Sequence, residues 1–469
     1  MVSIELNDLD DVNKPFIPQE PLMEKYSVEF EGSTIYIDSL DWRKSTRLKI
    51  QIIVSLINFI LFGLAEQSVG TLIPILQKQY HVNDMQTACI FLSSISGYIL
   101  MGMLNGYTHD KVGLKGILMI GTAAMVLGYG TFSTAPPFFI LVVFATCNGI
   151  GCGVLDAACN TWIGSLVDSN QILGLLHGCY GLGSMLSPSL ISYLIEREVN
   201  PWKWNQYYLI LCGLALSMFT TSFFAYKYET AAKYKYVTKL KMEKEVAEAA
   251  EAGLDADSDD TPGIQAPLSQ VMKKPLVWVL SSILFIYVGA EVGFGAWLIS
   301  FLTRINHLPF GQSSHIATTF WCGLMMGRTT LGFVTAHYFS TELSANFTYI
   351  SLSVLGYTLF YIFSFTKFVP LIFIIVAFTG YVVGPIFQTT IVASIGILPS
   401  SFHTSGVGFI CAIGGSGAAG IPFLVGVIAQ SSKTGLRVYP LVILGLYVIL
   451  WGLWMYIVRR FSGSYRKAQ

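Results

Sequence analysis

GIGCGVLDAACNTWIGSLVDSNQILGLLHGCYGLGSMLSP, residues 149–188, consists of two long apolar segments joined by a few polar residues. Asp156, Asn160 and His177 lie inside these segments. An ionisable side chain at the centre of a membrane-spanning helix costs about 2.5–3.5 kcal/mol or more, so it normally faces a cavity and serves a function. Asp156 and Asn160 are four residues apart and therefore share one helix face. We predict that this face lines a water-accessible pathway across a membrane.

The composition is that of a polytopic membrane protein, with 53% hydrophobic and 12% charged residues. An average soluble protein is about one quarter charged. Acidic and basic residues balance at 28 each, so the net charge gives no sign of a nucleic-acid partner. The eight cysteines lie in apolar segments without a CxxC pair, so we expect buried thiols and neither a metal site nor a cofactor. No P-loop, GxSxG or HExxH motif is present, which argues against an enzyme.

Apolar windows of about 20 residues, long enough to cross a bilayer, recur twelve times in two sets of six. The first set lies near 50–73, 87–105, 114–132, 138–164, 171–195 and 206–226, and the second near 276–302, 315–337, 344–366, 369–395, 404–430 and 438–458. The segment between them is rich in charge and has room for one amphipathic helix. We therefore predict an all-α polytopic fold. Its expected parts are a disordered tail (1–48), a first six-helix bundle (49–226), a linker (227–275), a second six-helix bundle (276–460) and a short tail (461–469).

The two sets of spans repeat in sequence. A shift of 225 in numbering relates Glu66-x-x-x-Gly70 to Glu291-x-x-x-Gly295, and a shift of 226 relates Gly97 and Gly106 to Gly323 and Gly332. A shift of 234 relates Gly174, His177, Gly181, Gly183 and Pro188 to Gly408, Cys411, Gly415, Gly417 and Pro422. Two parallel six-helix repeats would enclose a site at the membrane midplane. Glycines at these spacings let helix backbones approach closely.

Lysine and arginine in the loops predict the orientation. The loops on the side of both termini carry most of these residues, so we expect both termini to be cytosolic. The plasma membrane is the favoured location, with a vacuolar or other internal membrane as the alternative. The sequon at Asn346-Phe347-Thr348 then lies on the cytosolic side and is expected to be unglycosylated.

The loop after the second span reads GYTHDKVGLK over residues 106–115. It resembles the G-x-x-x-D-R/K-x-G-R/K-K loop of the major facilitator superfamily. The resemblance implies that the loop clamps the cytosolic ends of the helices, through its acid near a helix N-terminus and its basic side chains near carboxylates and lipid headgroups. Arg328 lies near the cytosolic half of its own span, where it could snorkel or pair with an acid. The expected clamp residues are Gly106, Asp110, Lys111, Gly113, Lys115 and Arg328.

Three stretches resemble one branch of this superfamily, the fucose permease-like proton symporters of fucose, galactose and other hexoses. The LDAACN around Asp156 resembles the L-E-T-A-A-N of the branch, which implies that Asp156 is its fourth-helix acid. His177-x-x-Tyr180 falls where the bacterial symporter binds sugar through amide side chains. Residues 289–297, GAEVGFGAW, are similar to the seventh-helix G-x-E-x-x-x-G-x-W of eukaryotic members. Glu66 stands where fungal-type relatives carry their first-helix acid, so the chain is identified as a fungal-type member.

The candidate site residues keep more than one interpretation. The residues expected to move protons are Asp156, Glu66 and Glu291, although the two glutamates could instead accept hydrogen bonds that hold the halves together. An imidazole gains or loses a proton near neutral pH, so the histidine could be a proton relay, a sugar donor or a core residue. Tryptophans stack on sugars or pack in cores, and amides bind hydroxyls or join helices. The expected substrate-binding residues are Asn160, His177, Tyr180, Gln67, Trp297, Trp321 and Gln388.

Our hypothesis from the sequence is an alternating-access carrier of a small neutral solute, a hexose-type sugar, coupled to protons. Beyond Arg328 no basic cluster lines the predicted spans, which argues against a phosphorylated or dicarboxylate cargo. Two alternatives stay open: a carrier of an amphiphilic, lipid-like metabolite, and a nutrient sensor that binds without transport. The expected partners are the solute, protons and the lipid bilayer, and we expect the chain to act as a monomer.

Overall fold

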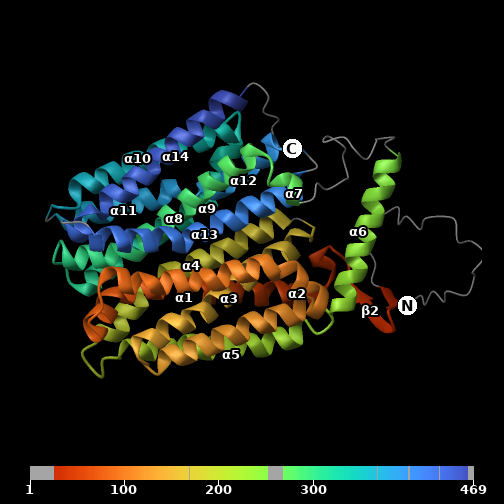
Figure 1. Cartoon of the computed structure of the whole chain (residues 1–469), viewed down its shortest axis with the longest axis horizontal. Helices are drawn as coiled ribbons and strands as arrows, with labels where there is room; N and C mark the ends of the chain where they lie inside the picture. Colours follow the sequence, from red (N-terminus) through yellow and green to blue (C-terminus); the bar gives the residue numbers. More distant parts are fainter. Residues whose placement is uncertain are drawn as a thin grey trace, which may run out of the picture.

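The computed structural model describes residues 26–167, 169–251, 268–366, 368–399, 402–431 and 434–462. Long helices lie side by side in one bundle (Figure 1). The helices of the first half are α1 (Thr46–Tyr80), α2 (Asp84–Ser133), α3 (Phe138–Gly164), α4 (Ser169–Glu196) and α5 (Trp204–Ala225). Those of the second half are α8 (Pro275–Arg304), α9 (Phe310–Tyr338), α10 (Glu342–Phe363), α11 (Val369–Val383), α12 (Ile386–Ile397), α13 (His403–Ser431) and α14 (Tyr439–Phe461). The outer parts of the predicted tails, 1–25 and 463–469, lie outside the described residues.

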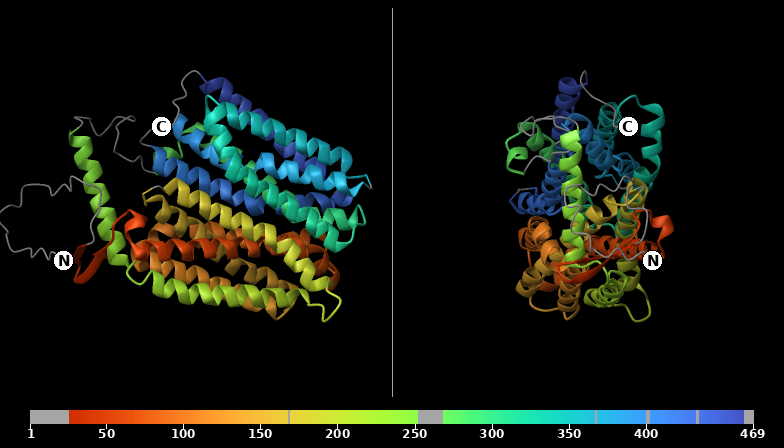
Figure 2. Two further views of the ribbon diagram at one scale, coloured as in Figure 1. Left: turned by 180° about the vertical axis from the view of Figure 1, so that it is seen from behind. Right: turned by 90° about the vertical axis from the view of Figure 1, so that its right-hand side faces the viewer.

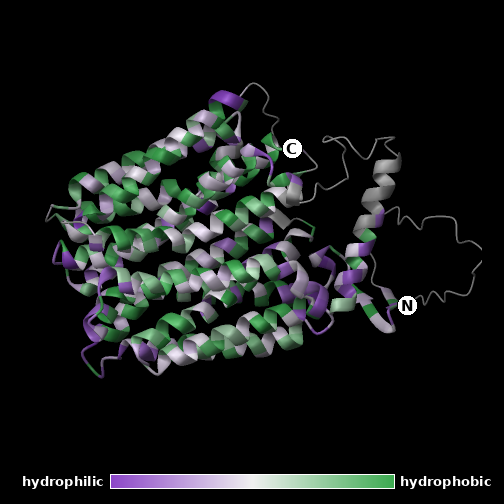
Figure 3. Cartoon of the chain, viewed as in Figure 1, coloured by the Kyte–Doolittle hydropathy of each residue, from purple (hydrophilic) through white to green (hydrophobic). Residues whose placement is uncertain are grey.

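The twelve predicted spans are confirmed. In the described part of the chain, nine helices are long and apolar enough to cross a membrane, with α11 and α12 counted together. α2 is counted once but contains two spans, because Gly113 (φ 68°, ψ 178°) breaks its helical path. The remaining two spans are α4 and α9. In Figure 3, hydrophobic residues cover the length of the bundle and hydrophilic residues gather at its two ends.

Each half has its own hydrophobic core. One cluster of buried residues extends through the first half from Leu48 to Tyr226. The other fills the second half, and it also includes Ile73, Ala88 and Phe91 from the first half. These three residues lie in the C-terminal part of α1 and the N-terminal part of α2, so the halves share a core at that end of the bundle.

The predicted repeat is also visible in the helix packing. Gly183 of α4 lies against the Ile60 carbonyl of α1, and Gly417 of α13 lies against the Phe285 carbonyl of α8. The numbers of Ile60 and Phe285 differ by 225, and those of the two glycines differ by 234, which are the shifts that relate these spans in the sequence. A side chain at either glycine would collide with main chain, so both close approaches depend on glycine.

The correspondence extends to α3 and to the broken span formed by α11 and α12. Gly149 of α3 packs against the main chain of α2, and Gly380 of α11 packs against the main chain of α9. The numbers of these glycines differ by 231. The same shift makes Asp156 of α3 equivalent to Phe387 of α12.

Part of the predicted disordered tail is folded, which corrects that prediction. β1 (Tyr26–Phe30) and β2 (Ser33–Ile37) form an antiparallel hairpin, followed by a short 3₁₀ helix, η1 (Trp42–Lys44). Apolar residues alternate with polar ones along β1, a pattern typical of a half-buried strand. The ring centroids of Phe30 and Tyr236 lie 5.4 Å apart, so the hairpin packs on the linker.

The linker contains the helix that its composition allowed, α6 (Ala231–Glu251), and a short helix, α7 (Leu268–Val271). α6 lies across the direction of the bundle, beside the hairpin (Figures 1 and 2). We call the end of the bundle that carries the hairpin and α6 the terminal side. The opposite end, which carries the short 3₁₀ helix η3 (Gly435–Val438), is the loop side.

Candidate functional site

Glu66 lies near the middle of α1, on the face that packs against α4. The Tyr180 hydroxyl of α4 donates a hydrogen bond of 2.5 Å to Glu66 Oε2. Gly63, one turn earlier, lies against the main chain of α4, which brings the two helices close enough for this bond. The Phe62 ring packs on the Tyr180 ring at 5.1 Å. Two residues predicted separately, an acid and a sugar-binding tyrosine, therefore form one unit.

Asp156 accepts hydrogen bonds from two neutral donors. Asn160 Nδ2 donates to Asp156 Oδ1 at 2.7 Å, as expected for partners four residues apart on a helix. The Tyr98 hydroxyl of α2 donates to the other oxygen, Oδ2. Sequence reasoning missed Tyr98, whose only sequence signal is a hydroxyl within an apolar run.

Glu291 is paired with a cation, unlike the other two acids. Arg328 Nη2 donates to Glu291 Oε1 at 2.8 Å and to Oε2 at 3.0 Å. The exposed fractions of the two side chains are 4% for the glutamate and 11% for the arginine. Arg328 therefore pairs with an acid, which is one of the two arrangements expected for it, and its assignment to the clamp stays a prediction.

The three acids belong to one electrostatic cluster. Glu66 interacts electrostatically with Asp156 and Glu291, and also with Arg328. Glu66 and Glu291 thus share a single guanidinium, which already pairs with Glu291. Among the described residues, no group of three or more His, Cys, Asp or Glu side chains could hold a metal ion.

His177 lies at the contact between the two halves. Its ring centroid is 5.9 Å from that of Phe59 in α1 and 6.2 Å from that of Phe387 in α12. Its repeat equivalent, Cys411 in α13, interacts with Asp156 of the first half. Because Asp156 and Phe387 are themselves equivalent, the two contacts across the interface are related by the internal repeat.

The other predicted substrate residues differ in their access to this cluster. Trp297 and Trp321 are fully buried in the core of the second half, where Trp297 Nε1 donates to the Pro422 carbonyl at 2.9 Å. Neither indole can touch a solute in this conformation, so their predicted stacking on a sugar has no support here. Gln67 is buried, and its Nε2 has no hydrogen-bond partner among the described residues. Gln388 is half-buried beside Phe387.

The predicted clamp loop binds the linker of its own half. The backbone of Gly113 lies against the main chain around Thr230, and Lys115 N donates to the Glu229 carbonyl at 3.0 Å. The ammonium group of Lys115 lies 4.0 Å from the Phe223 ring centroid. The other predicted clamp residues, Gly106, Asp110 and Lys111, lie on the same stretch of α2, and the last two are exposed.

On the loop side, polar contacts join the halves. Arg304 of α8 forms an ion pair with Asp84 of α2, and Gln77 Nε2 of α1 donates to the same carboxylate at 2.7 Å. Gly311 N of α9 donates to Glu196 Oε1 of α4 at 3.2 Å. Sequence reasoning missed these residues, because partners 220 positions apart carry no local signal.

On the terminal side, the same helices leave space beside their glycines. A Cβ added at any of these glycines would have no atom within 4 Å outside its own helix. They are Gly102 and Gly106 of α2, Gly174 and Gly178 of α4, Gly332 of α9 and Gly408 of α13. The halves are in contact at the loop side, whereas these six glycines toward the terminal side have no neighbouring helix packed against them.

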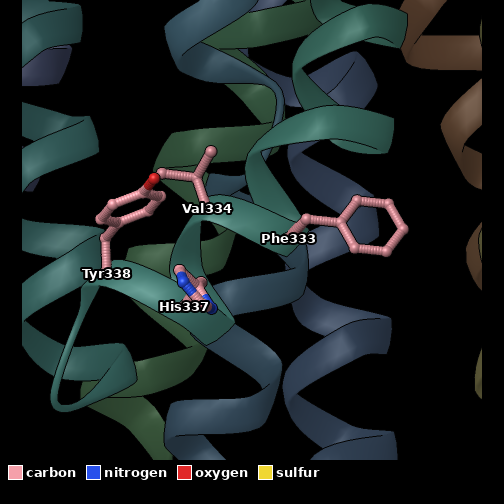
Figure 4. A pocket seen from close by; sticks show the side chains of 4 residues that line it. All are labelled: Phe333, Val334, His337 and Tyr338. Carbon is pink, nitrogen blue, oxygen red and sulfur yellow. The ribbon is translucent and has the colours of Figure 1, made fainter.

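A surface hollow at the terminal end of α9 is separate from the acidic cluster. It is lined by Phe333, Val334, His337 and Tyr338, all from one stretch of α9 (Figure 4). Phe333 and Tyr338 are 79% and 77% exposed, so the hollow lies on the outside of the helix. We do not assign it to the candidate site.

The predicted sequon is inside the bundle. Asn346 is fully buried, and its Nδ2 donates to Thr390 Oγ1 at 2.9 Å. A glycan at this position would have to displace the packing of α10 on α12, so burial gives a reason for its absence that does not depend on orientation.

Comparisons with known proteins agree with this architecture. A model of the Major Facilitator Superfamily matches residues 55–347. The chain is 31% identical over 441 residues to Bypass of stop codon protein 6 of Saccharomyces cerevisiae, covering 91% of this chain and 86% of that protein. It is 22% identical over 282 residues to the glucose/mannose transporter GlcP of Bacillus subtilis, covering 59% and 64% respectively. A solved structure of a bacterial homolog of the human lysosomal transporter Spinster, inward-facing and unoccupied, has a TM-score of 0.66 at 12% identity, covering 91% of this chain and all of that one.

Proposed function

Since the chain belongs to the major facilitator superfamily, we propose that it carries a hexose-type sugar across a membrane together with protons. It is a transporter and not an enzyme. The sugar, the proton coupling, the membrane and the monomeric state are parts of the proposal. Its placement in the fucose permease-like branch, as a fungal-type member, also stays a prediction.

The observation that carries the proton coupling is a pair of acids whose hydrogen-bond donors are all neutral. Glu66 and Asp156 accept hydrogen bonds from hydroxyl and amide groups, whereas Glu291 is neutralised by Arg328. Keeping a carboxylate in its charged form inside a membrane is costly, and intramembrane acids of this kind act in proton relays. Proton uptake by Glu66 and Asp156 would lower the negative charge buried in the cluster while the protein changes conformation.

A neutral, hydroxyl-rich cargo fits the groups around the acids. The one guanidinium in the cluster is already paired, so an anionic cargo would find no free cation there. Asn160, His177 and Gln388 offer neutral donors and acceptors that suit sugar hydroxyls. The Phe387 ring beside His177 offers an aromatic face for the apolar side of a sugar. The name of the Bacillus subtilis relative, a glucose/mannose transporter, supports the same class of solute.

The conformation supports transport by alternating access. The polar contacts between the halves described above gather at the loop side, and glycines of α2, α4, α9 and α13 toward the terminal side have no packed neighbour. In this superfamily, two halves rock around a site at the midplane. If the terminal side is cytosolic, as the loop charges predict, this state would receive or release its solute on the cytosolic side.

Uptake of radiolabelled hexoses into reconstituted vesicles tests the proposal. Glucose, mannose and galactose should each be tried, with and without a pH gradient across the membrane. We expect at least one sugar to accumulate against its gradient only when protons flow in the same direction. If none of the sugars accumulates at any pH gradient, the proposal is contradicted. If a sugar accumulates equally with and without a pH gradient, the carrier is not coupled to protons.

An amphiphilic cargo is the second candidate. Large apolar side chains are exposed toward the terminal side on α2 and α9. Met103 is 81% exposed and Phe333 is 79% exposed. A lipid-like solute could enter past such side chains from the bilayer. Transfer of a fluorescent single-chain lipid between leaflets, in vesicles that show no hexose uptake, would favour this candidate.

A further inference from the structure

Tyr98 lies where α2 of the first half crosses α13 of the second. Its hydroxyl donates to Asp156 in α3. A Cβ added at Gly415 of α13 would lie 2.6 Å from the same oxygen and 3.3 Å from two ring carbons. A single phenol group therefore touches a carboxylate of one half and a main chain of the other. Glycine at 415 is what leaves room for this arrangement.

This crossing marks a change in how tightly the two helices pack. Toward the loop side, Gly426 of α13 lies close to Ala88 of α2. Toward the terminal side, Gly102 of α2 and Gly408 of α13 face open space. Tyr98 is thus at the position along α2 where close contact with α13 gives way to separation.

The groups that face Asp156 come from four helices. Two of them, Tyr98 and Asn160, donate hydrogen bonds to its carboxylate, and the described groups that interact with it include no cation. The titratable groups of the set are Glu66 of α1, Tyr98 of α2, Cys152 and Cys159 of α3 and Cys411 of α13. Protonation is therefore the direct way to remove the charge of Asp156.

We propose that Tyr98 is a positioning residue that links the charge of Asp156 to the packing of α2 against α13. This inference rests on the proposed role of Asp156 in proton movement. When Asp156 is ionised, its two oxygens accept from Tyr98 and Asn160, and the phenol is held over Gly415. A proton taken from water onto Asp156 removes the charge that attracts the hydroxyl, because hydrogen bonds to ionised acceptors are the stronger ones. Tyr98 is then released and α13 can move past α2.

The internal repeat supplies a matched control for this contact. Gly181 of α4 is the equivalent of Gly415, and it also packs across the interface, where a Cβ added to it would lie 3.3 Å from Met325 Cβ of α9. An alanine at 181 therefore meets a flexible methionine side chain and no carboxylate. Gly415→Ala should push the Tyr98 hydroxyl away from Asp156, whereas Gly181→Ala should leave that bond intact.

A distance measurement without any solute tests the inference. Spin labels on non-natural amino acids at Met103 and Phe333 leave the native cysteines in place and report the opening of the terminal side, since both positions are highly exposed and belong to opposite halves. In the full chain in lipid nanodiscs, we expect the distance to change when the pH falls from neutral to mildly acidic. The change should be lost in Tyr98→Phe and in Gly415→Ala and kept in Gly181→Ala. An unchanged response in Tyr98→Phe, or no response in the wild type, would overturn the inference.

Glucose flux separates this inference from the proposed function. In Tyr98→Phe vesicles, we expect exchange of radiolabelled glucose to continue while accumulation driven by a pH gradient falls about tenfold. If the wild type carries no hexose but its distance change depends on Tyr98, the inference stands and the sugar proposal fails. If accumulation in Tyr98→Phe equals that of the wild type, the sugar proposal stands and the inference fails. Two independent variants, at 98 and 415, keep the test decisive if one of them does not fold.

Discussion

The two halves each have a glutamate at the same position of the repeat, but the two glutamates have different partners. Glu66 in α1 and Glu291 in α8 are related by the shift of 225 in numbering and are equivalent in the packing of their helices. Glu66 is held by the Tyr180 hydroxyl, and Glu291 is held by the Arg328 guanidinium. The partner, and not the position, decides whether such an acid can change its charge. An arginine fixes a carboxylate in its ionised form, whereas a phenol leaves it free to take up a proton.

The second acid of the first half strengthens this contrast. Asp156 corresponds to Phe387, and its donor Tyr98 corresponds to Leu324, so the second half has two apolar residues where the first has a hydrogen-bonded carboxylate. Proton chemistry is thus expected in the first half, with a fixed ion pair in the second. Substitutions at matched positions of the two halves test this asymmetry.

The largest effect is expected from Asp156→Asn. The amide keeps the shape and the Asn160 contact but cannot take up a proton. Accumulation of sugar driven by a pH gradient should fall to background, while exchange of sugar at equal pH continues. The matched variant Phe387→Leu, at the equivalent position of the second half, removes an aromatic face for the sugar and should lower total uptake. The uptake that remains should still depend on the pH gradient. Loss of that dependence in both variants would show that the position is structural in each half.

Arg328→Met tests the fixed ion pair. It leaves Glu291 buried without its cation, and breaking a buried pair in this way costs about 3–5 kcal/mol. We expect a large fall in the thermal unfolding midpoint in detergent, and recovery of much of it in the double variant with Glu291→Gln. If the double variant is no more stable than Arg328→Met alone, the arginine has a role besides neutralising this acid.

Tyr180→Phe measures the charge of the other acid. Loss of a hydrogen bond to a neutral carboxyl group costs about 1 kcal/mol, whereas a bond to an ionised one is worth about 1.5–3 kcal/mol. We expect the smaller loss at mildly acidic pH, measured as the shift in unfolding midpoint. A loss that stays at the larger value at every pH tested would mean that Glu66 remains ionised over that range.

The smallest effect is expected at the loop side, from Asp84→Asn. Arg304 is 38% exposed, and partly exposed ion pairs contribute about 0.2–1 kcal/mol. Removing this contact should slightly favour the conformation in which the halves separate at the loop side. A cysteine introduced on the loop side of the interface should then react faster with a water-soluble thiol reagent. Gln77→Ala, which removes only a neutral partner of the same carboxylate, should change the rate less.

The sequence was sufficient for the features that have a local or periodic signal. Twelve apolar windows gave the spans, glycine spacing gave the repeat, and the interval between Asp156 and Asn160 gave their hydrogen bond. The charged segment left room for one helix in the linker, where α6 forms. The loop predicted over residues 106–115 is instead helical, apart from the break at Gly113.

Partners on different helices could not be predicted, because they depend on how each helix is rotated and tilted against its neighbours. Tyr98 and Asp156 are 58 residues apart, and Arg304 and Asp84 are 220 apart. Arg328 was expected to snorkel or to pair with an acid, but the sequence could not name Glu291 as that acid. Tryptophan is a residue type typical of sugar-binding sites, but Trp297 and Trp321 are buried in the core of the second half.

The attachment of α6 has a practical consequence. Every contact of this helix described above is with the first half: the backbone of Gly113, the ring of Phe30 in the hairpin and the Lys115 amide next to its start. When the two bundles rock against each other, the hairpin and α6 should therefore move together with the first half. A fluorescent protein fused ahead of the hairpin would report the motion of that half alone, so an energy-transfer sensor of the transport cycle needs its second fluorophore beyond α14.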